Sequence, residues 1–420
     1  MFEGTKMNAI NFHLNPKDAS LRERALKVVP SGMTGHLDAS VLPEGYPQYF
    51  ERGQGCHLWD VDGRKFIDLM CSWGPNLLGY RHPAIEQAVQ QQQALGDCFN
   101  GPTPRFVELA ERFVERSAHA DWVMFQKNGT DATTACLTIA RAATGKRKIL
   151  IAKNAYHGAD PWCTPRPAGV TAEDRAHLIY YTFNNLQSLQ QAVDQAGNDL
   201  AGIMVSGFKH DMAQKLEMPT QAFANSVRQH SSKTGAVLIL DEVRTGYRLH
   251  KGGSWEPFGV RPDLSAWSKA IANGYALSAI TGIDSLKDAA SKIFTTGSFW
   301  SGGVAMAAAL ATLEVTDQID LVSHLEMIGN HFRNGIEKQA TNHGIKVNQS
   351  GPVQMPLILF EDDKDFSKGS KFCAQALSNG AYLHPKHNMF LCLAHTMDDI
   401  DLVLEATDKA FQILAQSTLR

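Results

Sequence analysis

The 420 residues, 44% of them hydrophobic and 20% charged, are enough to form two packed lobes with a large shared core. Forty Lys and Arg against 43 Asp and Glu give a net charge of −3, and no basic run interleaves with aromatic residues, which argues against nucleic acid as a partner. The N-terminal residues lack a signal-peptide core and the apolar stretch 304–313 is too short to span a bilayer, so we expect a cytoplasmic protein without a membrane segment.

The segment YFERGQGCHLWDVDGRKFIDLM (49–70) contains two β-like runs that are broken by turn signals at 53–55 and 62–63. This pattern predicts a meander of antiparallel strands. The seven cysteines form no CxxC pair and no cluster with histidine at metal-ligand spacing. We therefore expect reduced, buried thiols and no metal site.

From about residue 100 onward, helical and strand patterns alternate. ELAERFVERS (108–117) has helical periodicity, whereas KILIA (148–152), AGIMVS (201–206) and AVLILD (236–241) are short continuous apolar runs. This alternation predicts an α/β fold with a mostly parallel sheet covered on both faces.

After residue 318 the pattern changes to helix, strand, strand, helix, and it ends in the amphipathic segment DIDLVLEATDKAFQILAQ. We expect the two ends of the chain to form one smaller α+β domain. The predicted division is 1–75 and 319–420 for the small domain, with the large domain, 76–318, between them.

Two charged residues stand where strands of the predicted sheet end. Asp241 ends AVLILD, at the edge where open α/β folds bind ligands, although a helix N-cap or a turn would also explain it. Lys269 follows DLSAW and has apolar neighbours, which would lower the pKa of its amine and make it a nucleophile able to form a Schiff base. The alternative for Lys269 is a solvated surface charge.

Two further segments suit a phosphorylated ring. Asn128-Gly129-Thr130 precede a helix, where free backbone N–H groups can bind phosphate, although simple N-capping explains the same residues. NAYHG (154–158) places Tyr156 directly after a strand, as a flat partner for a ring.

Five motifs occur in one order along the chain: NGTDA…RAATG, AYHG, LILDEVRTGYR, FGVRPDLSAWSKAIANG and GSFWSGGVAMAAALATLE. In this order they resemble the class III pyridoxal 5'-phosphate (PLP) aminotransferases. The likeness is to the glutamate-1-semialdehyde aminomutase branch and extends over nearly the whole length. It implies the fold type I of PLP-dependent transferases, with PLP bound in the large domain.

The resemblance implies that Lys269 forms a Schiff base with PLP and later carries the substrate proton. It also implies that Asp241 pairs with the pyridine nitrogen and that Tyr156 stacks on the ring. Further cofactor contacts are implied for Gly129, Thr130, Val243, Gly297 and Ser298. Since the Gly297-Ser298 pair matches residues that reach the phosphate of a neighbouring subunit, we expect a homodimer with composite active sites.

Three segments depart from the aminomutase pattern. PSGMTGHLDASV (30–41) lacks the arginine that holds the substrate carboxylate in that branch, and His36 or Asp38 stands near its place. VSGFKHDMAQ (205–214) brings Lys209 and His210, and PKHN (385–388) lacks a glutamate usual in the branch. The resemblance also implies that Trp73 and Asn100 line the pocket. Solvated loops and core packing remain the alternatives for these residues.

These observations predict an aminotransferase that takes nitrogen from an amino acid, with glutamate as the expected donor, and gives it to an aldehyde or keto acceptor. The departures resemble what the transaminase making 8-amino-3,8-dideoxy-octulosonate would need, so a sugar acid is the expected acceptor. One alternative is an intramolecular aminomutase of the glutamate-1-semialdehyde type. Another is a PLP-binding protein without turnover.

Overall fold

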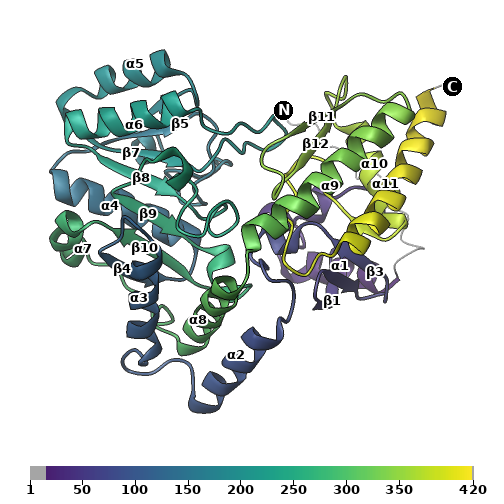
Figure 1. The fold of residues 1–420 in the computed structure, drawn as a ribbon, viewed down its shortest axis with the longest axis horizontal. Coiled ribbons are helices and arrows are strands. Elements are labelled where there is room, and N and C mark those ends of the chain that lie inside the picture. Colours follow the sequence, from purple (N-terminus) through teal and green to yellow (C-terminus); the bar gives the residue numbers. More distant parts are fainter. Residues whose placement is uncertain (1–15, 419–420) are drawn as a thin grey trace.

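The structure, a computed structural model, describes residues 16–418. It has a large lobe around a seven-stranded sheet and a small lobe to which both ends of the chain contribute (Figure 1). This arrangement confirms the predicted fold class. The division of the chain at residues 75 and 318 stays a prediction. Within the described residues, no helix combines the length and the hydropathy that crossing a membrane requires.

The large sheet has the strand order β4-β10-β9-β8-β7-β5-β6. Only β10 runs antiparallel to its neighbours, so the other six strands point the same way. The bounds are β4 Trp122–Gln126, β5 Lys148–Ala152, β6 Leu178–Tyr181, β7 Leu200–Ser206, β8 Val237–Asp241, β9 Leu264–Trp267 and β10 Ser278–Gly282. Every residue of β7 and β8 is buried, which explains their continuous apolar sequences.

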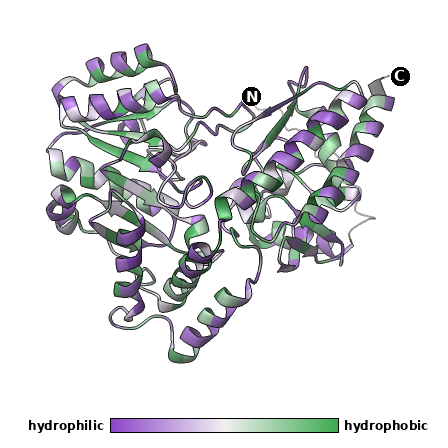
Figure 2. Ribbon diagram, in the orientation of Figure 1, coloured by the Kyte–Doolittle hydropathy of each residue, from purple (hydrophilic) through white to green (hydrophobic). Residues whose placement is uncertain are grey.

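Helices cover both faces of this sheet. One face packs on α5 (Leu186–Ala196) and α6 (Gln221–Thr234), and the other packs on α4 (Gly129–Thr144) and α7 (Lys287–Lys292). In Figure 2 the strands between these helices are mainly hydrophobic, whereas the outer helix surfaces are mixed or hydrophilic. Next to the sheet, α2 (Pro83–Leu95) and α3 (Arg105–Arg116) pack against α8 (Gly303–Gln318).

The small lobe joins the two ends of the chain in a sheet of order β1-β2-β3-β13. Strands β1 (Phe50–Gln54), β2 (His57–Asp60) and β3 (Lys65–Asp68) form the predicted antiparallel meander. The short strand β13 (Ala381–Tyr382) pairs in parallel with β3. The other elements are α1 Pro16–Val28, α9 Leu321–Asn342, β11 Val347–Ser350, β12 Leu357–Phe360, α10 Ser367–Ser378 and α11 Met397–Thr418.

The C-terminal part contains two elements that the sequence pattern did not predict. Helix α10 and strand β13 lie between β12 and α11, where the prediction passed directly from strand to final helix. Strand β13 has two residues, so it is too short to show a periodic pattern. Its pairing with β3 is a long-range contact that joins the two chain ends.

Candidate active site

The parallel strands of the large sheet end at one edge, and the candidate residues follow them. Asn128 and the first turn of α4 come after β4, Tyr156 comes after β5, and His210 comes after β7. Asp241 is the last residue of β8, and Lys269 lies two residues beyond β9. The topology therefore brings together groups that are far apart in sequence, at the edge where open α/β sheets bind ligands.

Asp241 is 5% exposed and is held by two hydrogen bonds. The Nδ1 atom of His157 donates to its Oδ2 at 2.7 Å, and the backbone N–H of Val243 donates to its Oδ1 at 2.9 Å. His157 is itself 2% exposed, and its carbonyl accepts from the Thr133 hydroxyl at 2.6 Å. The sequence interpretation missed His157, although it adjoins Tyr156 in NAYHG.

Lys269 is half-buried and has a left-handed backbone, with φ of 52°. Its Nζ donates to the carbonyl oxygen of Trp73 at 2.9 Å. Burial lowers the pKa of its amine to about 7, helped by the positive charge of Arg244 and opposed by Asp241. The amine of this half-buried lysine therefore has the lowered pKa that its apolar neighbours predicted.

The first turn of α4 lies against the segments after β5 and β8. A Cβ atom on Gly129 would stand 2.7 Å from Cγ1 of Val243, and one on Gly158 would stand 2.6 Å from Oγ1 of Thr130. The Thr130 hydroxyl accepts from the backbone N–H of Ala159 at 3.2 Å. Because the first N–H groups of a helix have no intrahelical acceptor, this crowded glycine-lined turn suits a phosphate group.

These features fit the cofactor that the sequence resemblance implies. Lys269 offers a half-buried amine, Asp241 offers a buried carboxylate, and the start of α4 offers backbone N–H groups. The ring of Tyr156 remains 43% exposed and carries a pKa that burial raises. Val243 lies against Gly129, beside the carboxylate of Asp241.

Three imidazoles surround the indole of Trp73, and we call His36, His384 and His387 with Trp73 the imidazole cage. The centroids of their rings lie 4.7, 5.3 and 4.9 Å from that of the Trp73 ring, each in an edge-on arrangement. Burial lowers the pKa of all three histidines, to about 4 for His384. At neutral pH each imidazole is therefore uncharged. Nδ1 of His384 accepts from the backbone N–H groups of Lys386 and His387, and Nδ1 of His387 donates to the carbonyl of Asn388 at 2.6 Å, so Nε2 of His384 is left as a donor and Nε2 of His387 as an acceptor.

The remaining predicted residues have different surroundings. His210 is 7% exposed, and burial together with Arg244 lowers its pKa. The ammonium of Lys209 is paired with Glu217 at 2.8 Å. Asn100 and Ser298 are exposed, and Gly297 lies in the loop between α7 and α8. None of these last three shows a hydrogen bond to Lys269 or Asp241 within residues 16–418.

Arg244 is a second residue that the sequence interpretation missed. It lies three residues beyond Asp241, in the turn after β8, and its Nη1 donates to Oδ1 of Asn388 at 2.5 Å. Burial lowers the pKa of its guanidinium to about 10, whereas the acidic groups of Asp241, Tyr156 and Asp211 oppose that change. The motif LILDEVRTGYR contained Arg244, but its sequence position alone does not show that it meets Asn388.

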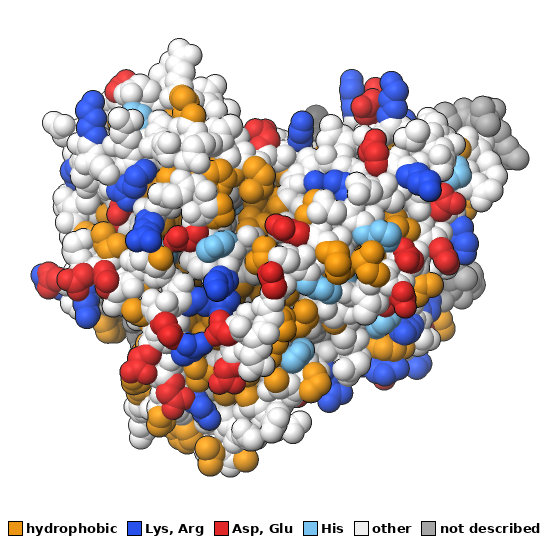
Figure 3. Space-filling view, viewed as in Figure 1, with side chains coloured by type: hydrophobic (Ala, Val, Ile, Leu, Met, Phe, Trp, Pro, Cys, Tyr) orange, Lys and Arg blue, Asp and Glu red, His pale blue; other side chains and the backbone are white. Residues whose placement is uncertain are grey.

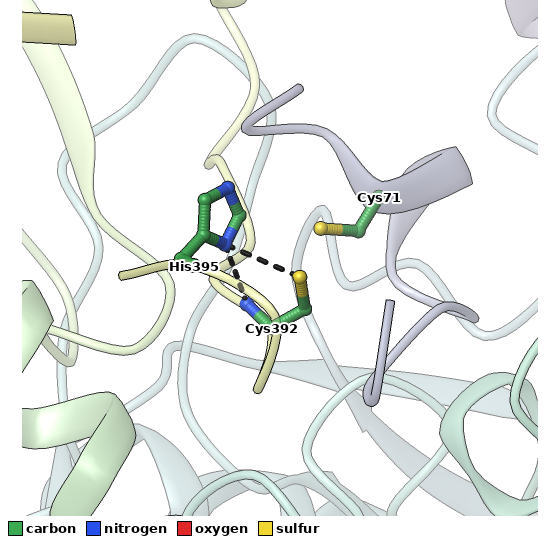
Figure 4. A group of neighbouring side chains, drawn as sticks. All are labelled: Cys71, Cys392 and His395. Atoms are coloured by element: carbon green, nitrogen blue, oxygen red, sulfur yellow. Dashed lines mark hydrogen bonds between the residues drawn. The ribbon is translucent and has the colours of Figure 1, made fainter. Parts of the chain in front are cut away.

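The structure brings together two cysteines, Cys71 and Cys392, that sequence spacing did not connect. Figure 4 shows the sulfur atoms of Cys71 and Cys392 directed towards each other beside His395, whose Nδ1 lies 3.2 Å from the Cys392 sulfur. The three side chains form a close group, contrary to the expectation of no cysteine–histidine cluster. All seven cysteines are free thiols, but Cys98 is exposed, so the expectation of buried thiols was wrong for that residue.

Comparisons with known proteins agree with this geometry. The family model described as aminotransferase class-III matches residues 43–411. The aminopentol aminotransferase of Sphingopyxis macrogoltabida is 47% identical over 395 residues, which cover 94% of each chain. A glutamate-1-semialdehyde 2,1-aminomutase of Natranaerobius thermophilus is 31% identical and covers 93% of this chain and 97% of its own.

A solved structure has nearly the same fold. The FumI protein of Sphingopyxis sp. MTA144, in its PLP internal aldimine form, superposes with a TM-score of 0.95 and 46% sequence identity. The match covers 96% of this chain and 98% of that one.

Proposed function

The chain is a PLP-dependent aminotransferase of the class-III family, and from that premise we propose that it moves the amino group of a hydroxyl-bearing amine to a carbonyl acceptor. The relative named aminopentol aminotransferase, 47% identical along 94% of the chain, supports the choice of amine. When bound, PLP supplies an electrophilic aldehyde and a ring that stabilises negative charge on the substrate carbon.

Lys269 is the proposed attachment point and proton carrier. With a pKa of about 7, a substantial fraction of its amine is unprotonated at neutral pH, as a nucleophile requires. The carbonyl of Trp73 holds Nζ at 2.9 Å, so the amine that receives and returns the substrate proton has a defined position.

The other proposed roles follow from the same contacts. Asp241, oriented by His157, would keep the pyridine nitrogen protonated, because a buried carboxylate favours a cation beside it. The N–H groups at Gly129 and Thr130 would bind the phosphate. Tyr156 and Val243 would contact the ring.

The imidazole cage carries the proposal for the amine. Its three uncharged imidazoles surround Trp73, the residue whose carbonyl holds the amine of Lys269. Nε2 of His384 can donate to a hydroxyl group and Nε2 of His387 can accept from one, whereas uncharged imidazoles offer a carboxylate no compensating charge. The cage therefore suits a substrate that carries hydroxyl groups next to the reacting carbon.

A matched pair of amines tests this. An amino polyol and the amine of the same carbon skeleton without hydroxyls are compared in the amine half-reaction, followed by the cofactor absorbance of the holoenzyme. We expect kcat/KM to favour the polyol by about 10-fold or more, since each hydrogen bond contributes roughly 0.5–1.5 kcal/mol. His36→Phe should reduce that preference. Equal values for the two amines in the wild type would refute the proposed amine.

The same assay tests the alternatives. An aminomutase would turn over a single substrate without a second carbonyl compound, and a PLP-binding protein without turnover would show no change in cofactor absorbance with any amine. Glutamate as donor and a sugar acid as acceptor remain predictions. Glutamate is tested on the holoenzyme in its PLP form, and the sugar acid on the holoenzyme that has already taken up an amino group.

We also propose that the active unit is a homodimer. Large apolar side chains near the loop that carries Gly297 and Ser298 are exposed, among them Phe294 at 92% and Phe299 at 67%. Leu95 and Phe99, at the end of α2 and just beyond it, are exposed at 75% and 54%. Figure 3 shows exposed apolar side chains at the lower end of the molecule, where Figure 1 places the end of α2.

A further inference from the structure

The guanidinium of Arg244 forms no close ion pair with a carboxylate among residues 16–418, although the charges of Asp241 and Asp211 act on it from further away. Its only hydrogen bond among residues 16–418 goes to the neutral amide of Asn388, and no carboxylate of the described chain lies within ion-pair distance of it. A guanidinium has five N–H donors, so most of its hydrogen-bonding capacity is free. Holding a cation partly out of water in this way is costly unless an anion completes the site.

The guanidinium is held in a fixed place. Asn388 is 2% exposed, and its own amide N–H donates to the carbonyl of Met389 at 2.9 Å, so the oxygen that receives Arg244 is itself oriented. The backbone of Arg244 belongs to the turn that closes β8, where the N–H of Gly246 donates to the carbonyl of Glu242 at 2.8 Å. The large lobe thus supplies the arginine and the C-terminal part supplies its anchor.

The neighbours of Arg244 place it on the substrate side of the site. Its partner Asn388 adjoins His387, a member of the imidazole cage, so the guanidinium lies beside that cage. Burial, and after it the positive charge of Arg244, lowers the pKa of Lys269, His210 and His387, which agrees with this position. The proposed phosphate site is different, because it is built from Gly129 and Thr130 at the start of α4. An anion bound at Arg244 would therefore not be the cofactor phosphate.

We propose that Arg244 binds the carboxylate of the acidic partner in transamination, a 2-oxo acid that accepts the amino group and leaves as the 2-amino acid. This inference rests on the proposed function and deepens it. The exchange balances: the amine loses NH₂ and H and gains a carbonyl oxygen, and the oxo acid undergoes the reverse change. One site would thus bind the hydroxyl groups of an amino polyol through imidazoles and the carboxylate of an acid through a guanidinium.

The test compares charged and uncharged acceptors in the holoenzyme that has already taken up an amino group. Pyruvate and pyruvamide have nearly the same shape, but only pyruvate carries a carboxylate. Hydrogen bonds to charged groups contribute about 1.5–3 kcal/mol, so Arg244→Met should lower the pyruvate-to-pyruvamide ratio of kcat/KM by roughly 10- to 100-fold. Arg244→Lys should fall between, because it keeps the charge and loses the fork.

A second variant leaves the arginine in place. Asn388→Asp puts a carboxylate at the position that now accepts from Nη1, so it should compete with pyruvate and lower the same ratio. A binding measurement makes the test independent of turnover. Calorimetry on the holoenzyme should show that propanoate, which has no amino or keto group, binds the wild type more tightly than propanamide and loses this advantage in both variants.

The outcomes separate the two proposals. An unchanged pyruvate-to-pyruvamide ratio in Arg244→Met and Asn388→Asp overturns the role of Arg244, whatever amine the enzyme uses. A ratio that falls in both variants, in an enzyme that does not react with amino polyols, supports Arg244 and refutes the proposed amine instead.

Discussion

At the scale of single residues, Lys269 is set apart from the other lysines by its surroundings. Three features act on one amine: burial, the charge of Arg244, and the carbonyl of Trp73 that receives Nζ. The left-handed φ of 52° at Lys269 is a backbone state that most residues avoid and that surrounding packing must enforce. Such locally unfavourable conformations concentrate at functional sites, which agrees with the proposed role.

Replacing Lys269 by Ala should remove covalent cofactor attachment. Borohydride reduction followed by mass measurement should find PLP fixed to the wild-type chain and absent from the variant. Turnover should fall by several orders of magnitude, because the same amine is proposed to carry the proton. Lys287→Ala, in the short helix α7, is the control and should keep attachment. Cofactor still fixed to the chain of Lys269→Ala would contradict the assignment.

The rate at which the apoprotein takes up PLP should depend on pH through Lys269. Because its pKa is lowered to about 7, the reactive neutral amine increases as pH rises to about 7 and is nearly complete by about pH 8. The uptake rate should therefore level off, whereas the rate for N-acetyl-lysine in solution should keep rising towards pH 10. An uptake rate that rises steadily to pH 9 would show that the pKa of the Lys269 amine is not lowered.

His157 should act as a positioning residue for Asp241. Removing the 2.7 Å hydrogen bond in His157→Phe should lower kcat by about 10- to 100-fold, the range expected for a hydrogen bond to a charged group. His157→Gln keeps an N–H donor and should lose less. In His157→Phe, bound PLP should also no longer show the absorbance that is typical of a protonated pyridine ring. A fall in activity with an unchanged absorbance spectrum would indicate a merely structural role.

The sequence predicted those site residues that motifs or strand ends mark. Asp241 and Lys269 end strands or follow them closely, so their common edge follows from the topology. His157 and Arg244 were missed because their partners, Asp241 and Asn388, are 84 and 144 residues away. Trp73 and His36 were predicted separately as pocket residues, but their meeting with His384 and His387 was not, because those residues are far away in the sequence.

At the scale of elements, the proposed phosphate turn depends on the contact between the start of α4 and the loop after β5. The strands of the large sheet were predicted within one residue at each end for 148–152, 201–206 and 236–241, because fully buried strands have continuous apolar runs. The close approach of Gly158 to Thr130 was not predictable, because it depends on how a loop of β5 crosses the start of α4.

Gly158→Ala should weaken cofactor binding. The new Cβ would stand 2.6 Å from Oγ1 of Thr130, and the backbone φ of +135° at residue 158 disfavours any side chain. Displacing Thr130 should lower PLP affinity about 10-fold and stability by roughly 1–3 kcal/mol. Gly145→Ala is the matched control. Gly145 follows the last residue of α4, also with a positive φ of +66°, but a Cβ there would meet nothing within 4 Å. Equal PLP affinity of the two variants, measured by titrating the apoproteins, would rule out the proposed phosphate turn.

At the scale of the whole molecule, the site is built from both lobes. The large sheet supplies Asp241, Lys269 and Arg244, whereas Trp73, His387 and the anchor Asn388 come from segments that flank the small lobe. Backbone hydrogen bonds join the segment near Trp73 to the segment near Asn388. The N–H of Phe390 donates to the carbonyl of Leu69 at 2.6 Å, and the N–H of Leu393 donates to the carbonyl of Leu77 at 2.9 Å. The sequence predicted two lobes but not which residues meet between them.

Complementation between two inactive variants tests whether the sites are shared between subunits. Lys269→Ala disables the site of its own chain, whereas Ser298→Asp should place a charge against the phosphate bound by the partner chain. Because each subunit of a composite dimer completes the other's site, a mixed dimer has one intact site and one with both defects. Random reassociation should then restore about one quarter of the wild-type activity.

The same mixture made with Phe294→Asp and Phe299→Asp added to both chains should stay inactive. Charges on these exposed rings should oppose the apolar contact that holds the subunits together, and sedimentation velocity should show monomers. Leu402→Asp, at an apolar residue 53% exposed on α11, is the control and should leave the sedimentation unchanged. If the mixture of Lys269→Ala and Ser298→Asp regained nothing while sedimenting as a dimer, Ser298 would serve the site of its own chain or none, because shared sites require recovery.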